Sequence, residues 1–587
     1  MRATSHLTSA VARGASRLSL ATVGLILMLS SIPASSEESE AFNADEIVDI
    51  EELDLAALLE TPLVSSASKR SQALDLAPAS VTVLEQEALR AQPWASVSDA
   101  LRRVVGVHVL RPAPNSIYVS MRGISAYNDN HLPILLNGRL LSNHSGGQPL
   151  IASVPVHVAD LERIEVLRGP SSTLYGANAF SGVVSLSTKK PLDHQGAEGQ
   201  FSLETRYVEE NERDPAGAST IASGGRGYLA YGWANDAETI GWRLSGGLSH
   251  NPEPWPAQAY EHGLFSYYAR SDLQVEADED SSLNVGLSHV FSETDVSLSP
   301  LAKTWMYADS EQALDIGLQL RKLGLDDLDL SVKADLARHA GAVTSVKSDS
   351  STLVERPSRY TAHGLMQADL RLWEERNVLS LGVETSYVDY EDWTRNPSYL
   401  YVGSFLQNET LFLEDRSLAL SVGARFEHIA SSDAGLDISY DHINPRAAIM
   451  WRALEDHAFR LAFATAFRTP TSFENFISRV STFDPRIPPV EFIRANPRLE
   501  AEETHGIELA YLGRFSDWLR LDLTLYGQWV QNLVRLEPEP RLPVVYDNAE
   551  GRLHTGLELA ATLALTEQVA GYVNYALTLV YDPDRDD

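Results

Sequence analysis

From about Gly196 to its end, the chain is a series of segments in which apolar and polar residues alternate. Residues 417–429 (SLALSVGARFEHI) are an example, and residues 519–529 repeat the pattern. Ser417, Ser421, Arg425 and Glu427 form one face of the first segment, and Leu418, Leu420, Val422, Ala424 and Phe426 form the other. Successive side chains of a strand point to opposite faces. A charged inner face and an apolar outer face are typical of a transmembrane barrel, whereas a soluble sandwich turns its apolar faces inward. The alternation therefore predicts a membrane all-β fold, an antiparallel β-barrel over residues 196–587.

The first 36 residues have the three parts of a secretory signal peptide. Arg13 and Arg17 precede an apolar core at residues 18–29, and small residues follow that core. The core is too short to span a bilayer comfortably. We therefore expect residues 1–36 to be a signal peptide and the protein to be exported.

Composition and motifs exclude several classes of function. The formal net charge is −33, so we expect no nucleic-acid partner, which would require a basic surface. The absence of cysteine excludes disulfides and thiolate metal sites. No zinc-binding H-E-x-x-H and no nucleophile elbow G-x-S-x-G occurs in the chain. We therefore expect no enzyme, no catalytic residue, no metal site and no cofactor.

Residues 160–190 (DLERIEVLRGPSSTLYGANAFSGVVSLSTKK) form the most specific motif of the chain. The stretch begins as an alternating strand, breaks at Gly169-Pro170 and resumes as a β-rich run after Gly182. Its glycine spacing fits neither a phosphate-binding loop nor a dinucleotide-binding turn. A phosphate-binding function is therefore excluded for this motif.

The motif closely resembles the signature of the plug domain of TonB-dependent outer-membrane receptors. Other plug-like segments precede it in the same order, at residues 77–84, 97–109, 120–125 and 132–141. The last of them (LPILLNGRLL) predicts a hairpin whose turn is Asn137-Gly138. The resemblance implies a small α+β plug domain at residues 77–191 that fills the barrel.

The resemblance extends to the barrel but departs from the family's pattern at the C-terminus. Barrel landmarks of the family lie at residues 443–451, 462–471, 496–509 and 547–560. The family's barrels hold about 22 strands, an even number like other large barrels, whereas we count roughly 17 here. The chain ends in YDPDRDD, without a terminal aromatic residue. We expect a barrel that is incomplete at its C-terminus, because the sequence is a fragment or the gene is truncated.

Residues 37–76 are predicted to be a periplasmic linker that contains the TonB box. The stretch Glu60 to Ser68 resembles this box, in which an extended strand adds to the edge of a partner's sheet. The resemblance assigns Glu60, Thr61, Leu63, Val64, Ser65, Ser66 and Ala67 to it. Asp45 to Ile50 is a second and poorer match, and a plain linker is the alternative because Pro62 interrupts the strand.

The resemblance also implies two kinds of site in the plug. Its apical loops would hold the ligand through Tyr127, Asn128, Asp129, His131, Asn143 and His144. Ordinary polar loops are the alternative interpretation for each of these residues. Plug arginines would face barrel glutamates, and the matching residues are Arg122, Arg168, Glu502 and Glu508.

The implied function is active uptake of a scarce nutrient by a multi-pass β-barrel in the outer membrane of a Gram-negative bacterium. The substrate would be a ferric siderophore or a related metal chelate, with heme and cobalamin as further classes. The expected partners are TonB of the inner-membrane energising complex, this small-molecule ligand and outer-membrane lipid, and the receptor is expected to be a monomer. The alternative is a non-transporting surface receptor or a non-functional truncated remnant.

Overall fold

The computed structural model describes most of the chain from Pro62 onward, all of it within one compact unit that runs from Asp54 to the C-terminus. The described residues are 62–70, 72–90, 96–113, 116–124, 130–141, 154, 156–208, 220–251, 264–296, 305–322, 327–346, 352–373, 376–391, 396–413, 415, 417–433, 435–476, 478–481, 490–516, 518–537, 543–566 and 569–582. In these residues no helix is long and apolar enough to cross a bilayer. The predicted signal peptide lies outside them.

The plug is built on a five-stranded sheet in the order β3-β8-β9-β6-β7. These strands are β3 (Ser80–Glu85), β8 (Leu161–Arg168), β9 (Gly182–Thr188), β6 (Ile134–Leu136) and β7 (Arg139–Leu141). Other plug elements are β1 (Leu63–Val64), β2 (Gln72–Ala73), β4 (Val107–Ala113), β5 (Ser116–Met121), α2 (Gln86–Arg90), α3 (Val97–Leu101), α4 (Ser172–Tyr175) and the 3₁₀ turns η3 (Leu74–Leu76) and η5 (Val158–Asp160). The predicted hairpin is confirmed, since β6 and β7 pair across Asn137 (φ 52°) and Gly138 (φ 90°).

The plug core is apolar and lies between the sheet and α3. The side chain of Ser96 caps α3 by accepting the Asp99 amide. The helix then buries Val97 and Leu101 in a cluster that also contains Ile164 of the sheet. Burial of this cluster gives the plug a core of its own.

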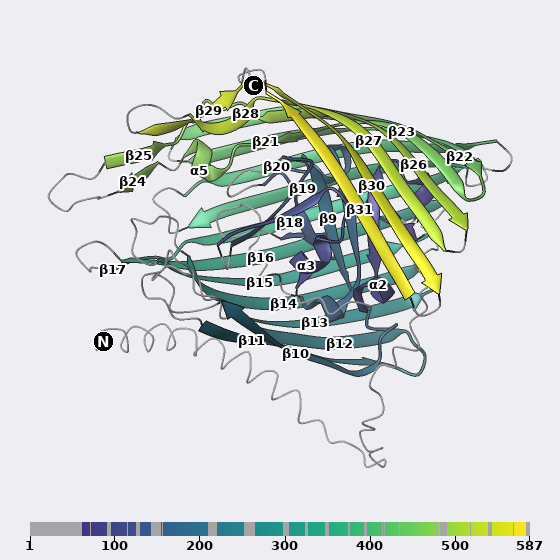
Figure 1. The fold of residues 1–587 in the computed structure, drawn as a ribbon, viewed down its shortest axis with the longest axis horizontal. Helices are drawn as coiled ribbons and strands as arrows, with labels where there is room; N and C mark the ends of the chain where they lie inside the picture. Colours follow the sequence, from purple (N-terminus) through teal and green to yellow (C-terminus); the bar gives the residue numbers. More distant parts are fainter. Residues whose placement is uncertain are drawn as a thin grey trace, which may run out of the picture. The chain divides into compact units, whose positions relative to one another are not determined.

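The barrel sheet contains 18 strands, and each strand of it pairs antiparallel with its neighbours. They are β10 (Gly196–Val208), β11 (Thr220–Ala234), β12 (Ile240–Asn251), β13 (Leu264–Asp278), β14 (Ser281–Val296), β15 (Trp305–Leu320), β16 (Leu328–Val346), β17 (Thr352–Glu355), β18 (Ser358–Leu372), β19 (Asn377–Glu391), β20 (Ser398–Phe412), β21 (Leu418–Asp433), β22 (Leu436–Leu454), β23 (His457–Arg468), β26 (Glu502–Ser516), β27 (Leu519–Gln531), β30 (Arg552–Thr566) and β31 (Val569–Tyr581). β17 and β18 follow one another along the same side of β16 and therefore share one place in the sheet. The 18 strands thus occupy 17 places side by side. This agrees with the predicted count of roughly 17. In Figure 1 the sheet curves around the plug strands.

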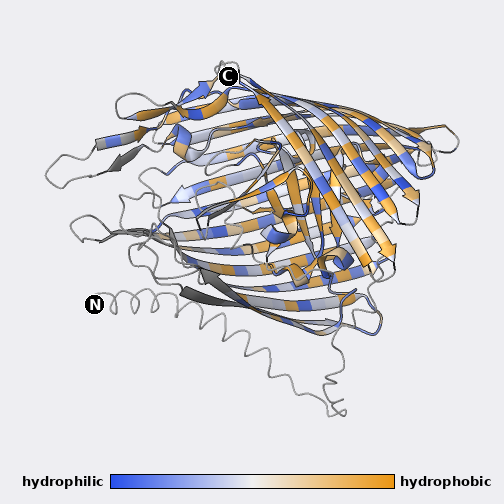
Figure 2. Cartoon of the chain, viewed as in Figure 1, coloured by the Kyte–Doolittle hydropathy of each residue, from blue (hydrophilic) through white to orange (hydrophobic). Residues whose placement is uncertain are grey.

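The two faces of the barrel strands differ as the alternation predicted. On β21, Phe426 faces outward and is 46% exposed, whereas the neighbouring Arg425 and Glu427 face inward and are buried. On β27, Leu525 faces outward and Thr524 is fully buried. Figure 2 shows the same alternation as orange and blue bands along the strands. An apolar outer face over a polar lumen confirms the transmembrane barrel.

The connections at the two ends of the barrel sheet differ in length. At one end, short turns such as residues 455–456 join consecutive strands. At the other end, long connections carry α5 (Ser472–Asn475) and a four-stranded sheet in the order β24-β25-β29-β28. Its strands are β24 (Arg479–Ser481), β25 (Val490–Arg494), β28 (Leu533–Glu537) and β29 (Val544–Ala549). Outer-membrane barrels have short periplasmic turns and longer extracellular loops, so this second end is the extracellular one.

Candidate functional site

Arg122 of the plug is buried between two carboxylates of the barrel. Its guanidinium donates to Glu508 Oε1 at 2.5 Å and to the two oxygens of Glu558 at 3.0 and 3.2 Å, and it lies 4.2 Å from the ring centre of Tyr526. Burial lowers the pKa of Arg122, but the charges of the two glutamates outweigh it and hold that pKa above its ordinary value. Arg122 also has a left-handed φ of 54°, a conformation that is unfavourable for a residue with a side chain. The strained residue is thus held by a charged, buried contact with the barrel.

Arg168 lies next to Arg122 and shares one of its partners. It donates to Glu558 Oε2 at 2.9 Å and to Asp522 Oδ2 at 3.1 Å. Gly169 follows with a φ of 89°, and a Cβ at this position would lie 2.5 Å from Glu508 Oε1. The arginine-glycine-proline turn therefore lets the plug backbone approach the barrel glutamates closely.

The barrel partners of Arg168 differ from the expected Glu502 and Glu508. Asp522 lies on β27, which pairs with β26, and Glu558 lies on β30, the next strand of the sheet; both face the same lumen. Arg122 does pair with the expected Glu508, but the expectation for Arg168 was wrong, because the rotation of the plug inside the barrel decides which carboxylates each arginine reaches. The alternation of residues 519–529 is consistent with Asp522 facing the lumen, and Glu558 lies in the barrel landmark at residues 547–560, but neither was predicted as a partner of Arg168.

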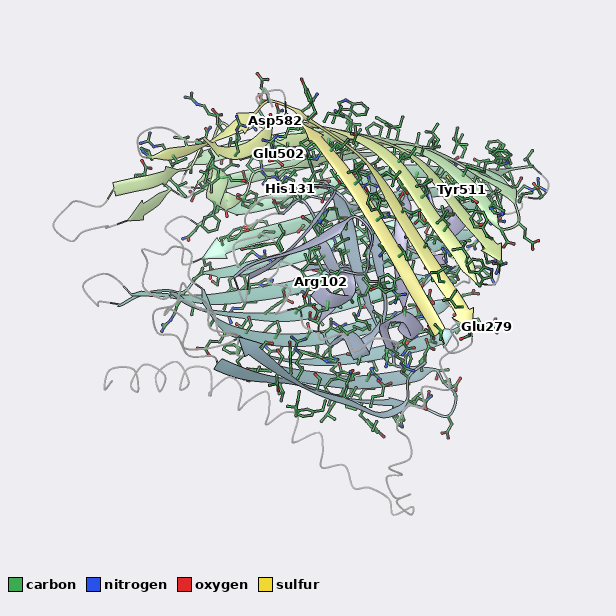
Figure 3. All side chains as sticks on the ribbon, viewed as in Figure 1. Arg102, His131, Glu279, Glu502, Tyr511 and Asp582 are labelled. Atoms are coloured by element: carbon green, nitrogen blue, oxygen red, sulfur yellow. The ribbon has the colours of Figure 1, made fainter. Side chains whose placement is uncertain are left out.

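Glu502 is fully buried at the extracellular end of β26, away from both plug arginines. It accepts two hydrogen bonds from Arg468 of β23, each 2.7 Å long, and contacts the ring of His131 in the plug. His131 is only 2% exposed. Its expected place in a ligand-facing apical loop is therefore wrong for this conformation, because its ring is enclosed by Glu502 and Phe180. Figure 3 labels His131 and Glu502 inside the barrel.

The other predicted ligand-binding residues lie outside the described part of the chain. They are Tyr127, Asn128, Asp129, Asn143 and His144. Their assignment to a ligand site stays a prediction.

The described part of the predicted TonB box is folded against the plug. We call residues 62–68 the box segment; Glu60 and Thr61 lie outside the described residues. The backbone amides of Ser65 and Ser66 donate to Glu165 Oε2 at 3.0 and 2.8 Å, and the Tyr175 hydroxyl donates to the Ser66 carbonyl at 2.9 Å. Val64 is fully buried. Leu63 and Val64 do form a strand, but that strand pairs with β2, and Glu165 and Tyr175 bind backbone groups of Ser65 and Ser66, so these groups are not free to pair with a partner in this conformation.

Two barrel arginines hold the chain on either side of η3. Arg446 Nη1 donates to the Ala67 carbonyl at 3.0 Å, and Arg460 Nη1 donates to the Ala77 carbonyl at 3.2 Å. Arg460 also donates to the Ser80 hydroxyl at 2.7 Å. The end of the box segment and the chain that follows it are therefore attached to the barrel wall as well as to the plug.

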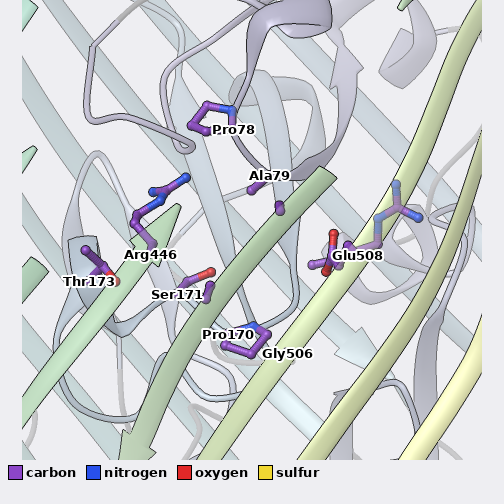
Figure 4. Close-up of a pocket in the computed structure, with 11 residues that line it drawn as sticks. Pro78, Ala79, Pro170, Ser171, Thr173, Arg446, Gly506 and Glu508 are labelled. Atoms are coloured by element: carbon purple, nitrogen blue, oxygen red, sulfur yellow. The ribbon is translucent and has the colours of Figure 1, made fainter. Parts of the chain in front are cut away.

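A small cavity separates the plug from β22, β23 and β26 near these arginines (Figure 4). Its lining residues are Pro78, Ala79, Arg168, Pro170, Ser171, Thr173, Arg446, Ala462, Ala464, Gly506 and Glu508. Its volume of about 20 Å³ has room for about one water molecule. The cavity is thus part of a closely packed plug–barrel interface and is too small for a nutrient.

Comparisons with known proteins agree with this arrangement of a plug held inside a barrel. The family model described as "TonB-dependent Receptor Plug Domain" matches residues 73–183, and the one described as "TonB dependent receptor-like, beta-barrel" matches residues 189–587. The chain belongs to the TonB-dependent receptors. This family consists of outer-membrane receptors and transporters and is not a family of enzymes. The predicted family, outer-membrane location and role in nutrient uptake are confirmed.

Several named proteins are similar to this receptor in sequence or in fold. It is 24% identical to the iron-regulated outer membrane virulence protein of Vibrio cholerae, over 89% of this chain and 78% of that protein. It is 25% identical to the hemin receptor of Yersinia pestis, over 78% of this chain and 68% of that protein. Among solved structures, the siderophore receptor PirA of Pseudomonas aeruginosa has the same fold, with a TM-score of 0.64, 17% identity and 85% of each chain covered.

Proposed function

We propose that this TonB-dependent receptor imports an iron chelate, a ferric siderophore or heme, by a movement of its plug that TonB drives. The observation that carries the proposal is the buried plug–barrel contact at Arg122 and Arg168, which joins the plug to three carboxylates of the wall. A plug held in this way closes the lumen, so import requires work on the plug. The outer membrane has neither nucleotide nor ion gradient, so that work would come from TonB of the inner-membrane complex.

The box segment supports this route for energy. In the proposal TonB pairs with residues around Val64 and pulls, because an extended strand can add to the edge of a partner's sheet. Release of the Ser65 and Ser66 amides from Glu165 would expose the backbone groups that such pairing needs. Residues 1–36 as signal peptide, residues 37–76 as linker and a monomeric state belong to the same proposal.

The substrate class rests on the named relatives. One is iron-regulated, one is a hemin receptor and a third, from Vibrio vulnificus, is a vitamin B12 transporter. Among the similar solved structures, two are named siderophore receptors and two are named ferric enterobactin receptors. Iron chelates are the class that most of these names share, and cobalamin is the second class to test.

An uptake panel tests the proposal. A host without its own iron-chelate and cobalamin receptors would produce the full chain and receive radioactive ferric catecholate, ferric hydroxamate, hemin or cyanocobalamin. We expect one iron chelate to accumulate, and we expect accumulation to stop in the same host without TonB. Accumulation of cyanocobalamin alone would overturn the substrate class. Surface binding without accumulation would show a non-transporting receptor.

A further inference from the structure

A buried charged cluster joins the extracellular connections of the barrel to the plug. We define the Arg468 cluster as Arg468, Glu474, Glu502, Asn130 and His131. Arg468 ends β23 and Glu502 begins β26, and the two residues are opposite each other in the barrel sheet. Arg468 donates to both oxygens of Glu502 and to both oxygens of Glu474, the latter at 2.9 and 3.2 Å. One guanidinium thus holds two carboxylates from two different elements.

On its extracellular side, the cluster holds both long connections. Glu474 belongs to α5, where its carboxylate accepts the Thr471 amide at 2.6 Å and completes a capping box. Phe476 after α5 packs on Tyr399 of the barrel, with ring centres 6.4 Å apart. Glu502 Oε1 accepts the backbone amide of Val534 in β28 at 2.6 Å. A movement of either connection therefore acts directly on a carboxylate that Arg468 binds.

On its inner side, the cluster holds the plug. Arg468 Nη1 donates to Asn130 Oδ1 at 2.9 Å, and Glu502 contacts His131. The His131 carbonyl accepts the backbone amides of Phe180 and Ser181 at 3.2 and 2.9 Å. These two residues directly precede β9, the middle strand of the plug sheet. Through the His131 carbonyl, the cluster therefore binds the two residues that precede the central strand of the plug sheet.

Burial makes the members of the cluster depend on one another. Arg468 is 3% exposed and Glu502 is fully buried. Withdrawal of Glu474 removes two of the five hydrogen bonds that position the Arg468 guanidinium and leaves those to Glu502 and Asn130, so we expect Arg468 to shift together with these two partners. The same two side chains are the ones that hold Asn130 and His131.

We propose that Arg468 is a positioning residue that couples the extracellular connections to the plug. A ligand that displaces α5 or β28 changes the hold of Arg468 and Glu502 on Asn130 and His131, and this loosens the start of β9. The proposal deepens the proposed function and rests on it, since it supplies the step from ligand binding to plug movement.

The coupling is measured without a ligand by hydrogen–deuterium exchange of the full chain in membrane vesicles. Glu474→Gln removes the charge of Glu474 but keeps an oxygen for the Thr471 amide, so the cap of α5 is retained. We expect exchange at the amides of Phe180 and Ser181 to rise about tenfold, although Glu474 has no hydrogen bond to either. Heat-modifiable migration on gels checks that the variant barrel is assembled.

Arg494→Ala is the matched control. Arg494 lies in the same connection, is 54% exposed in its side chain and pairs only locally with Glu491. We expect this variant to leave exchange at Phe180 and Ser181 unchanged.

A second variant, His131→Gln, tests the inner half of the route. If the two residues act through one cluster, Glu474→Gln adds little exchange in a His131→Gln background. Faster exchange in α5 alone, with no change at Phe180 and Ser181, would overturn the proposal. So would a double variant in which the two rises in exchange rate at Phe180 and Ser181 multiply, because the two residues would then act independently. These results do not depend on uptake, so failure of the coupling and failure of the proposed function are distinguishable.

Discussion

At the scale of single residues, a few buried charges hold the plug in the barrel. Arg122 and Arg168 both donate to Glu558, so each arginine stabilises a carboxylate that the other also uses. Such a network is costly to break at one residue, because the remaining charge stays buried without that partner. The contact is therefore expected to resist spontaneous opening of the lumen.

The first prediction concerns Arg168. Arg168→Ala removes one donor from Glu558, which keeps Arg122, and leaves Asp522 without this partner. Because the Asp522 side chain is 18% exposed, the expected cost lies below the about 3–5 kcal/mol of a fully buried, uncompensated charge. We expect a looser plug, measured as higher single-channel conductance in lipid bilayers and as greater sensitivity of the cells to large antibiotics.

The control for this prediction is another arginine of the plug. Arg102, labelled in Figure 3, has a side chain that is 51% exposed and lies 4.0 Å from Asp99. Exposed pairs of this kind contribute little to stability. Arg102→Ala is therefore expected to conduct like the unmodified receptor. Equal conductance of the Arg168 and Arg102 variants would show that Arg168 does not retain the plug.

At the scale of elements, the box segment has two mutually exclusive sets of partners. Within the plug, β1 pairs with β2, and the amides of Ser65 and Ser66 bind Glu165. Pairing with TonB would use backbone groups of the same residues. The docked segment therefore has to leave the plug before it can add to another sheet.

The prediction at this scale uses Val64→Pro. A second proline after Pro62 removes one backbone donor and prevents regular strand pairing. We expect the variant to bind the chelate identified by the uptake panel at the cell surface but not to import it. Binding and accumulation of the radioactive chelate are measured on the same cells.

Val64→Ala is the matched variant, because it also loses the buried apolar side chain but keeps the backbone donor. We expect it to retain import. Import by the proline variant at the unmodified rate would place the coupling strand elsewhere in residues 37–76.

At the scale of the whole molecule, the distribution of polarity decides which surface meets lipid. The outward residues of β21 and β27 are apolar, and the inward residues are buried by the plug or by other luminal side chains. The plug takes the place of water for many of those luminal groups, as Arg122 does for Glu508. The outer face has no such partner and stays apolar because it contacts hydrocarbon.

Leu525→Arg tests this assignment at the middle of β27. An arginine facing lipid near the midplane destabilises an outer-membrane barrel by about 2–4 kcal/mol. We expect less folded receptor at equal urea concentration when refolding into vesicles is followed by heat-modifiable migration. Leu525→Phe keeps an apolar side chain at the position and should fold like the unmodified receptor. If both variants folded equally well, Leu525 would not face lipid.

The sequence by itself determined the features that depend on neighbouring residues. Alternation assigned the inner and outer faces of β21 and β27, and Asn137-Gly138 marked the turn between β6 and β7. Each of these follows from local backbone geometry, in which the strand has a period of two and the turn needs positive φ. The motif at residues 160–190 likewise marked the plug.

Only the tertiary structure decided which charges meet across the plug–barrel interface. Arg168 and Glu558 are 390 positions apart in the chain, and His131 and Glu502 are 371 apart. No local pattern relates such residues, because the rotation and depth of the plug in the lumen bring them together. The same docking buries His131, which sequence reasoning had placed in a ligand-binding loop, and makes Arg468 the link between the extracellular connections and β9.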